Sequence, residues 1–166
     1  MAFLKNKFFL YFFIFLIFFI FTLFFERNLF LKLKILNLSF KERSEIIKTL
    51  ELYNKIFMDF YASSGNPALI DDFPTSKILK HEIFKDIGFL SSGGRVLVYD
   101  LINYKILNWD VKSSKEVFLK VLEIWNFQYQ EIQERKPVSE IKQTNFLANY
   151  HLKNIKGKWQ ILEWSP

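Results

Sequence analysis

The hydrophobic pattern of the chain opens with residues 8–25, a run without charge, glycine or proline. At about 1.5 Å per helical residue the run reaches roughly 27 Å, close to the roughly 30 Å hydrocarbon core of a bilayer. It therefore predicts one membrane-spanning helix. A cleaved secretory signal is the alternative, but the small residues of a cleavage site do not follow Phe25.

The side of the membrane on which the rest of the chain lies stays open. Basic residues flank the run on both sides, Lys5 and Lys7 before it and Arg27, Lys32 and Lys34 after it. The positive-inside rule needs an asymmetry in these charges, so it assigns no orientation. Residues 28–40 fit either a helix or an extended strand at the membrane surface.

Apolar residues then recur at helical spacing in two segments. From Ser39 to near Ser63, one stripe predicts a long amphipathic helix, formed by Ile46, Leu50, Tyr53, Phe57 and Phe60. A second helix is expected to start between Asp72 and Ser76, with Pro74 in its first turn or just before it. Its predicted buried residues are Ile78, Leu79, Ile83, Phe84 and Ile87.

Beyond residue 94 the period changes toward two, which is typical of strands. Short strands are predicted at 96–99 and 104–111, followed by a turn at 112–115. Residues 117–129 alternate most clearly, and their apolar face holds Val117, Leu119, Val121, Trp125, Phe127 and Tyr129. A helix over the same residues is the alternative. A loop at 132–140, a strand at 142–153, a turn at 154–158 and a strand at 159–164 follow.

Helices followed by antiparallel strands predict an α+β fold, in which two or three helices pack on a curved sheet. The segments EIWNFQYQ (123–130), NFLANYHLKNIKGKW (145–159) and QILEW (160–164) resemble the cone-shaped nuclear-transport-factor-2-like superfamily. More narrowly, the chain is similar to membrane-tethered IMS-type domains of cyanobacteria and plastids, which act in organelle or cell division. The resemblance covers roughly residues 41–166. The expected organisation is an anchor at 1–27, a juxtamembrane segment at 28–40 and a cone-like domain at 41–166.

Composition removes several classes of function. The chain has no cysteine and two histidines, which excludes disulfides, thiol catalysis and cysteine-ligated metals and disfavours a histidine-built metal site. The net charge of +6 falls to +4 for residues 26–166, since Lys5 and Lys7 leave 21 basic residues against 17 acidic ones. The basic residues are scattered, so no nucleic-acid groove is predicted, although some can face lipid headgroups beside the anchor. No cofactor is implied.

Glu123 is the one weak candidate for catalysis. It is a carboxylate on the apolar phase of residues 117–129, and burial in a dry cavity would raise its pKa toward acid–base use. A structural position at a strand end or bulge is the plainer reading. Leu122 and Ile124 lie on the opposite face, where a partner could cover them, and Trp164 is a further interface candidate.

Other polar residues have plainer interpretations. Tyr99 and Asp100, like Trp109 and Asp110, are adjacent in strands and should point to opposite faces. His81 and His151 are predicted to be exposed. Residues 91–95 contain two glycines but precede a strand, which is the wrong context for a phosphate-binding loop.

Two functional hypotheses remain. The first is a non-enzymatic, single-pass membrane protein whose domain binds another protein or a second copy of itself. The second is an anchored enzyme or carrier that admits a small apolar ligand to the interior, with Glu123 as its polar group. A filled interior and an apolar outer sheet face would favour the first.

Overall fold

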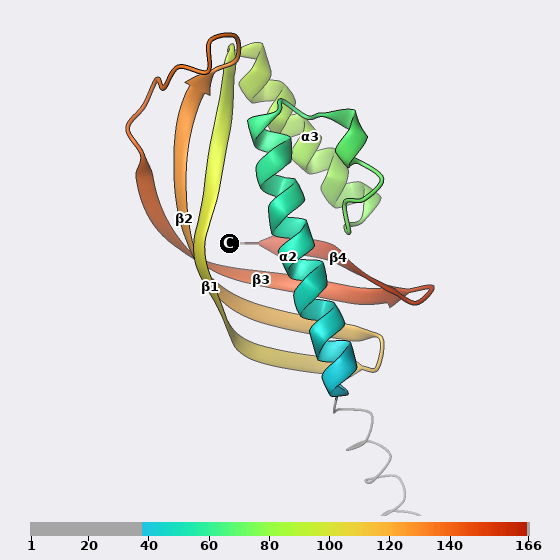
Figure 1. The fold of residues 1–166 in the computed structure, drawn as a ribbon. Helices are drawn as coiled ribbons and strands as arrows, with labels where there is room; N and C mark the ends of the chain where they lie inside the picture. Colours follow the sequence, from blue (N-terminus) through green and yellow to red (C-terminus); the bar gives the residue numbers. More distant parts are fainter. Residues whose placement is uncertain (1–37, 166) are drawn as a thin grey trace, which may run out of the picture. The chain divides into compact units, whose positions relative to one another are not determined.

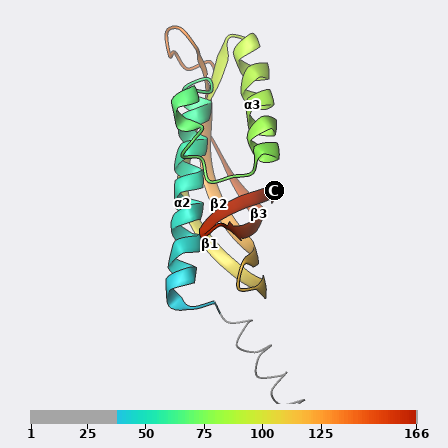
Figure 2. The ribbon, with the colours of Figure 1, turned by 90° about the vertical axis from the view of Figure 1, so that its right-hand side faces the viewer.

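The computed structural model describes residues 38–165, which lie within one compact unit, Leu38–Pro166. Two α-helices and a short 3-10 helix precede four strands, and both α-helices lie on the concave face of the sheet (Figures 1 and 2). The α+β architecture predicted from the sequence is confirmed. The proposed membrane-spanning run, 8–25, lies outside the described residues. Within residues 38–165, no helix combines the length and the apolar character needed to span a bilayer.

Helix α2 spans Phe40–Ala62 and begins with a capping box. The Ser39 side chain accepts a hydrogen bond from the Glu42 backbone N–H, and the Glu42 carboxylate accepts one from the Ser39 N–H at 2.8 Å. Its predicted apolar stripe is buried, apart from the half-buried Phe57. The helix therefore covers the inner face of the sheet with the residues that the periodicity singles out.

The second predicted helix is α3, Lys77–Ser92, and it begins after Pro74. Ser76 caps it by accepting a hydrogen bond from the Leu79 N–H at 3.1 Å. Leu79, Ile83 and Ile87 are buried, whereas the prediction that Ile78 is buried is wrong, because its side chain is 74% exposed. Ile78 precedes Leu79 by about 100° around the helix and so lies off the packed face. The short helix η1, Pro67–Leu69, lies between α2 and α3.

The strands form an antiparallel meander in the order β1-β2-β3-β4. Their bounds are Arg95–Ser113 for β1, Glu116–Glu131 for β2, Lys142–Ile155 for β3 and Lys158–Ser165 for β4. The two strands predicted at 96–99 and 104–111 are one strand, β1, whose pairing with β2 shifts register at three bulges or irregularities. Bulges bend a strand without ending it, and β1 curves around α2 in Figure 1. The strand reading of 117–129 is confirmed by β2.

A short parallel contact covers part of the free edge of β4. The Ile161 N–H donates to the Pro74 carbonyl, and the Ser76 N–H donates to the Ile161 carbonyl, at 2.8 and 2.9 Å. The Thr75 hydroxyl also donates to the Ile161 carbonyl at 2.7 Å. The segment before α3 thus acts as a brief fifth strand, a role that the helix prediction for residues 72–76 did not include.

Candidate functional site

Glu123 lies on the inner face of β2 and is fully buried. The alternation that places it beside Val121 and Trp125 forces a carboxylate toward the core. Helix α2 lies over this part of the sheet and contributes Tyr53 and Asn54, both buried, to the surroundings of Glu123. Burial on the inner face agrees with the sequence pattern. Glu123 lies in the middle of the strand, where its β1 and β3 partners are both in register.

Two side chains donate hydrogen bonds to the Glu123 carboxylate. The Trp125 indole N–H donates to Oε2 at 3.0 Å, and the Tyr150 hydroxyl donates to Oε1 at 2.5 Å. No lysine or arginine forms an ion pair with Glu123 among residues 38–165. Burial raises the pKa of Glu123, and the hydrogen bonds from Tyr150 and Trp125 offset part of this effect.

Tyr150 links the carboxylate to helix α2. Its hydroxyl lies 2.5 Å from Glu123 Oε1 and 3.5 Å from Asn54 Oδ1, and one hydroxyl proton serves only one acceptor at a time. When Glu123 is ionised, the Tyr150 hydroxyl donates its hydrogen bond to the carboxylate. When Glu123 is protonated, its own O–H can donate to Tyr150, whose proton is then free to turn toward Asn54. The cluster can therefore satisfy both protonation states without moving a strand.

Glu123 lies apart from three surface pockets of the domain. Glu123 lines none of these three pockets of the described residues. The first is lined by residues from 45–52, 71–74 and 157–160, the second by residues from 91–95 and 131–138, and the third by residues from 59–69 and Arg135. Within residues 38–165, no cluster of three or more carboxylate or imidazole groups could hold a metal ion. A substrate has no route to the carboxylate through these three pockets.

The opposite face of β2 carries the interface candidates Leu122 and Ile124, both half-buried. Leu122 is paired in register with Leu147 of β3, which is 43% exposed, and Ile124 is paired with Asn103 of β1. Ile102, 49% exposed, lies at the adjacent bulge of β1. We call Ile102, Leu122, Ile124 and Leu147 the outer-face patch. Leu147 and Ile102 were not singled out from the sequence, because their membership depends on strand register.

Trp164, the third interface candidate, is on the other side of the sheet. It is paired with Tyr150, which is on the inner face, and its ring centroid lies 6.4 Å from that of Phe57 on α2. Its half-buried position lines the rim of the core rather than the outer-face patch. Paired residues of antiparallel strands share a face, so this placement follows from the β3–β4 register.

The remaining predictions for polar residues are mostly confirmed. Asp100 and Asp110 are exposed and their neighbours Tyr99 and Trp109 are half-buried in the core. His81 is exposed. His151 points outward, but the prediction that it is exposed is wrong. Its side chain is 15% exposed, since the ring stacks on Phe118 with centroids 4.2 Å apart and Nε2 lies 2.8 Å from Glu116 Oε1.

Comparison with known proteins shows a likeness of fold. No protein-family model matches the chain, and no curated protein is recognisably similar in sequence. Among solved structures, the chain is similar to the crystal structure of the intermembrane space region of the chloroplast protein ARC6, with a TM-score of 0.58 and 11% identity. The match covers 71% of this chain and 90% of that one.

Proposed function

We propose that the protein is a single-pass membrane protein whose cone-like, nuclear-transport-factor-2-like domain binds another protein and catalyses no reaction. The observation that carries this proposal is the outer-face patch, an apolar area spread over three strands on the side of the sheet away from both helices. Apolar side chains in that position are typical of the centre of a protein interface. The fold likeness to a region of ARC6 is compatible with the proposal.

The charges beside the outer-face patch indicate the character of the partner. Lys105 is paired with Leu122, and Lys120 lies two residues before Leu122 on the same face; both lysines are exposed. An amphipathic segment with an apolar face and acidic flanking residues complements this arrangement. We therefore assign the patch to such a segment of a partner protein. A second copy of the chain is the alternative occupant that the experiment must separate.

Membrane attachment belongs to the same proposal and rests on residues 8–25. A tether confines the domain to the membrane surface and raises its effective concentration toward membrane partners, so a modest interface suffices. The full-length protein should remain in the membrane fraction after alkaline carbonate washing, whereas residues 38–166 alone should be soluble and folded. Recovery of full-length protein in the wash would remove the anchor from the proposal.

Site-specific photo-crosslinking in native membranes tests the binding function. A photoreactive amino acid at Asn145, which is exposed and paired with Ile124, should give an adduct with a different protein. The same group at Lys85, exposed on α3, is the control and should not. Leu122→Asp and Ile124→Asp should abolish the adduct while the domain stays folded, and Glu123→Gln should not affect it. An adduct of two identical chains would identify the occupant as a second copy, and an Asn145 adduct insensitive to both aspartates would contradict binding at the patch.

A further inference from the structure

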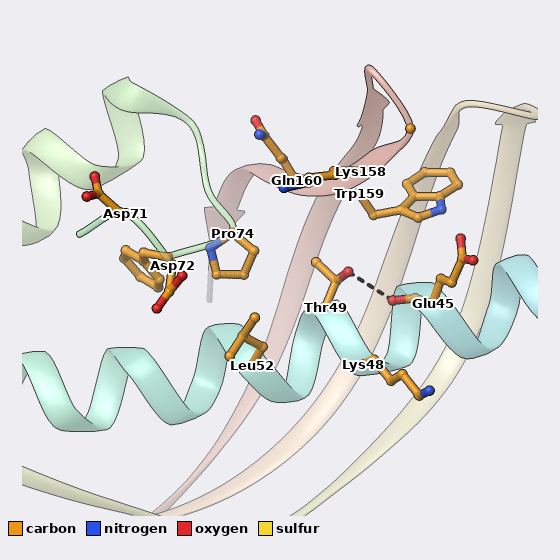
Figure 3. Close-up of a pocket in the computed structure, with 12 residues that line it drawn as sticks. Glu45, Lys48, Thr49, Leu52, Asp71, Asp72, Pro74, Lys158, Trp159 and Gln160 are labelled. Atoms are coloured by element: carbon orange, nitrogen blue, oxygen red, sulfur yellow. Dashed lines mark hydrogen bonds between the residues drawn. The ribbon is translucent and has the colours of Figure 1, made fainter. Parts of the chain in front are cut away.

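A groove lies on the opposite side of the domain's core from the outer-face patch, between helix α2 and the start of β4 (Figure 3). It has a volume of about 470 Å³. Glu45, Lys48, Thr49 and Leu52 line it from α2; residues 71–74 and 157–160 form the other walls. None of these residues belongs to the outer-face patch, so the groove is a separate surface of the domain.

The floor of the groove includes an unpaired part of the β4 edge. The Asn154 N–H donates to Lys115 on the β2 side, so the Asn154–Trp159 pair is one that shares no ladder hydrogen bonds. The backbone N–H and C=O of Trp159 therefore face the outer edge of β4, as those of Ile161 do two residues later. Ile161 is bonded there to Pro74 and Ser76. Among residues 38–165, no backbone hydrogen bond outside the strand ladders reaches Trp159.

The chain itself stops short of covering this position. In the parallel register that pairs Thr75 with Ile161, the residue opposite Trp159 would be Phe73. The Phe73 N–H instead donates to the Ile70 carbonyl in a turn at 3.4 Å, and residues 71–74 form the far wall of the groove. An edge strand with free backbone groups is a template for another extended segment. The groove is open where one would lie.

The side chains of the groove specify what kind of segment fits. Leu52, 42% exposed, and Pro74 offer apolar contact. The lining contains three carboxylates and two ammonium groups, namely Glu45, Asp71, Asp72, Lys48 and Lys158, and none of the five forms an ion pair within residues 38–165. In a chain of net charge +6, this groove is locally acidic. It therefore favours a basic side chain beside an apolar one.

Trp159, which lines the groove, also carries a buried indole donor. Trp159 is 4% exposed, and its indole Nε1 is buried without a hydrogen-bond partner among the described residues. A buried N–H that lacks an acceptor costs free energy, typically about 1–3 kcal/mol. The Thr49 hydroxyl donates to the Glu45 carbonyl within α2, as Figure 3 shows, and it accepts no hydrogen bond from the Trp159 indole.

We infer that this groove binds a short extended segment of a partner protein, which adds to the β4 edge at Trp159 and places a lysine or arginine against Asp71 and Asp72. Backbone hydrogen bonds to Trp159 supply the pairing, and the carboxylates select the basic residue. The site is separate from the outer-face patch, so either can fail without the other.

A displayed library of random peptides, selected on the full-length protein in detergent micelles, provides the probe. Selected peptides should combine a basic residue with an apolar residue. Asp71→Lys combined with Asp72→Lys should weaken their binding by about tenfold or more, since both residues are exposed and opposite charges would now repel. Glu134→Lys combined with Glu140→Lys makes the same charge change in the β2–β3 loop and should leave binding unchanged.

Hydrogen exchange on the peptide complex tests the strand pairing itself. The Trp159 amide should become protected, whereas the Ile161 amide, already bonded to Pro74, should change little. Methylation of the peptide nitrogen that donates to the Trp159 carbonyl should abolish both binding and protection. Peptides that bind Asp71→Lys/Asp72→Lys normally, or that protect β2 instead of Trp159, would overturn the assignment. If the Trp159 amide is protected without peptide because the protein self-associates, the segment that binds the groove belongs to a second copy of the chain and not to a partner protein.

Discussion

The two faces of β2 carry similar apolar side chains, yet only one of them is covered. On the inner face, Leu119 and Val121 are no more than 2% exposed; on the outer face, Leu122 and Ile124 are half-buried and Phe118 is 37% exposed. The inner face also contains a carboxylate, Glu123, which the outer face of this part of the strand lacks. Residues 122–124 taken alone therefore do not tell which face is the core, whereas the polar residues Lys120, Asn126 and Gln128 on the outer face do. The difference arises because α2 packs on one side.

Removal of β4 should have the largest effect, because this strand closes the inner face. Deleting residues 157–166 removes Trp159 and Ile161, both buried, and the bonds that hold residues 74–76 to the edge of the sheet. Truncation of one buried aromatic residue costs about 3–5 kcal/mol, while a whole domain is stable by about 5–15 kcal/mol. We expect residues 38–156 to show no cooperative thermal transition by circular dichroism. A transition at the parent temperature would mean that β4 is dispensable.

A matched pair of leucine substitutions compares the two faces directly. Leu119→Ala should destabilise residues 38–166 by about 2–5 kcal/mol, because a fully packed site is left with a cavity. Leu147→Ala, at a side chain 43% exposed, should change the free energy of unfolding by no more than about 0.5 kcal/mol. Urea unfolding midpoints measure both. Equal losses would show that the outer face is packed as tightly as the inner one.

Glu123→Gln tests whether the buried carboxylate of Glu123 lowers the stability of the folded domain when it is ionised. Burial raises its folded pKa above the ordinary value of 4.5, so the folded state binds the proton more tightly than the unfolded chain does. The contribution of Glu123 is therefore most favourable below its unfolded pKa and is lost as the pH rises through the raised folded pKa. The glutamine variant should escape this loss and melt at a higher temperature than the parent at pH 7.

The hydrogen bonds of the cluster can survive this change. The glutamine oxygen can accept from Trp125, and its NH₂ group can donate to the Tyr150 hydroxyl, which remains free to donate to Asn54. Glu163→Gln, at an exposed carboxylate of β4, is the control for loss of one negative charge. A glutamine variant with the parent's pH profile would show that Glu123 does not titrate differently in the folded state.

Removal of the N-terminal cap of α2 should have the smallest effect on stability. The cap stabilises the first turn of the helix, whereas the side chains that pack on the inner face of the sheet stay unchanged. Ser39→Ala removes the acceptor for the Glu42 N–H and should cost about 1 kcal/mol. Ser44→Ala, in the same helix, is the control, because the Ser44 hydroxyl makes no side-chain hydrogen bond within residues 38–165. The free energy of unfolding in urea distinguishes them. A loss several times larger would indicate that α2 frays and uncovers the sheet.

Local sequence signals determined much of the fold. The capping box at Ser39 and the apolar stripe from Ile46 define α2, and strict alternation defines β2, because each of these signals depends on side chains a few residues apart. Alternation also placed Glu123 on the inner face and Leu122 with Ile124 on the outer face. These assignments need only the period of a strand, which is a local property of the backbone.

Tertiary structure decided which of these residues meet. The hydrogen bonds of Glu123 with Tyr150, the pairing of Leu122 with Leu147 and the free edge at Trp159 all depend on strand register and on chain segments many residues apart. The continuity of β1 through its bulges depends on pairing with β2. The burial of His151 depends on stacking against Phe118 of the neighbouring strand. Such contacts leave no periodic trace in the sequence, because register is set by the packing of the whole domain.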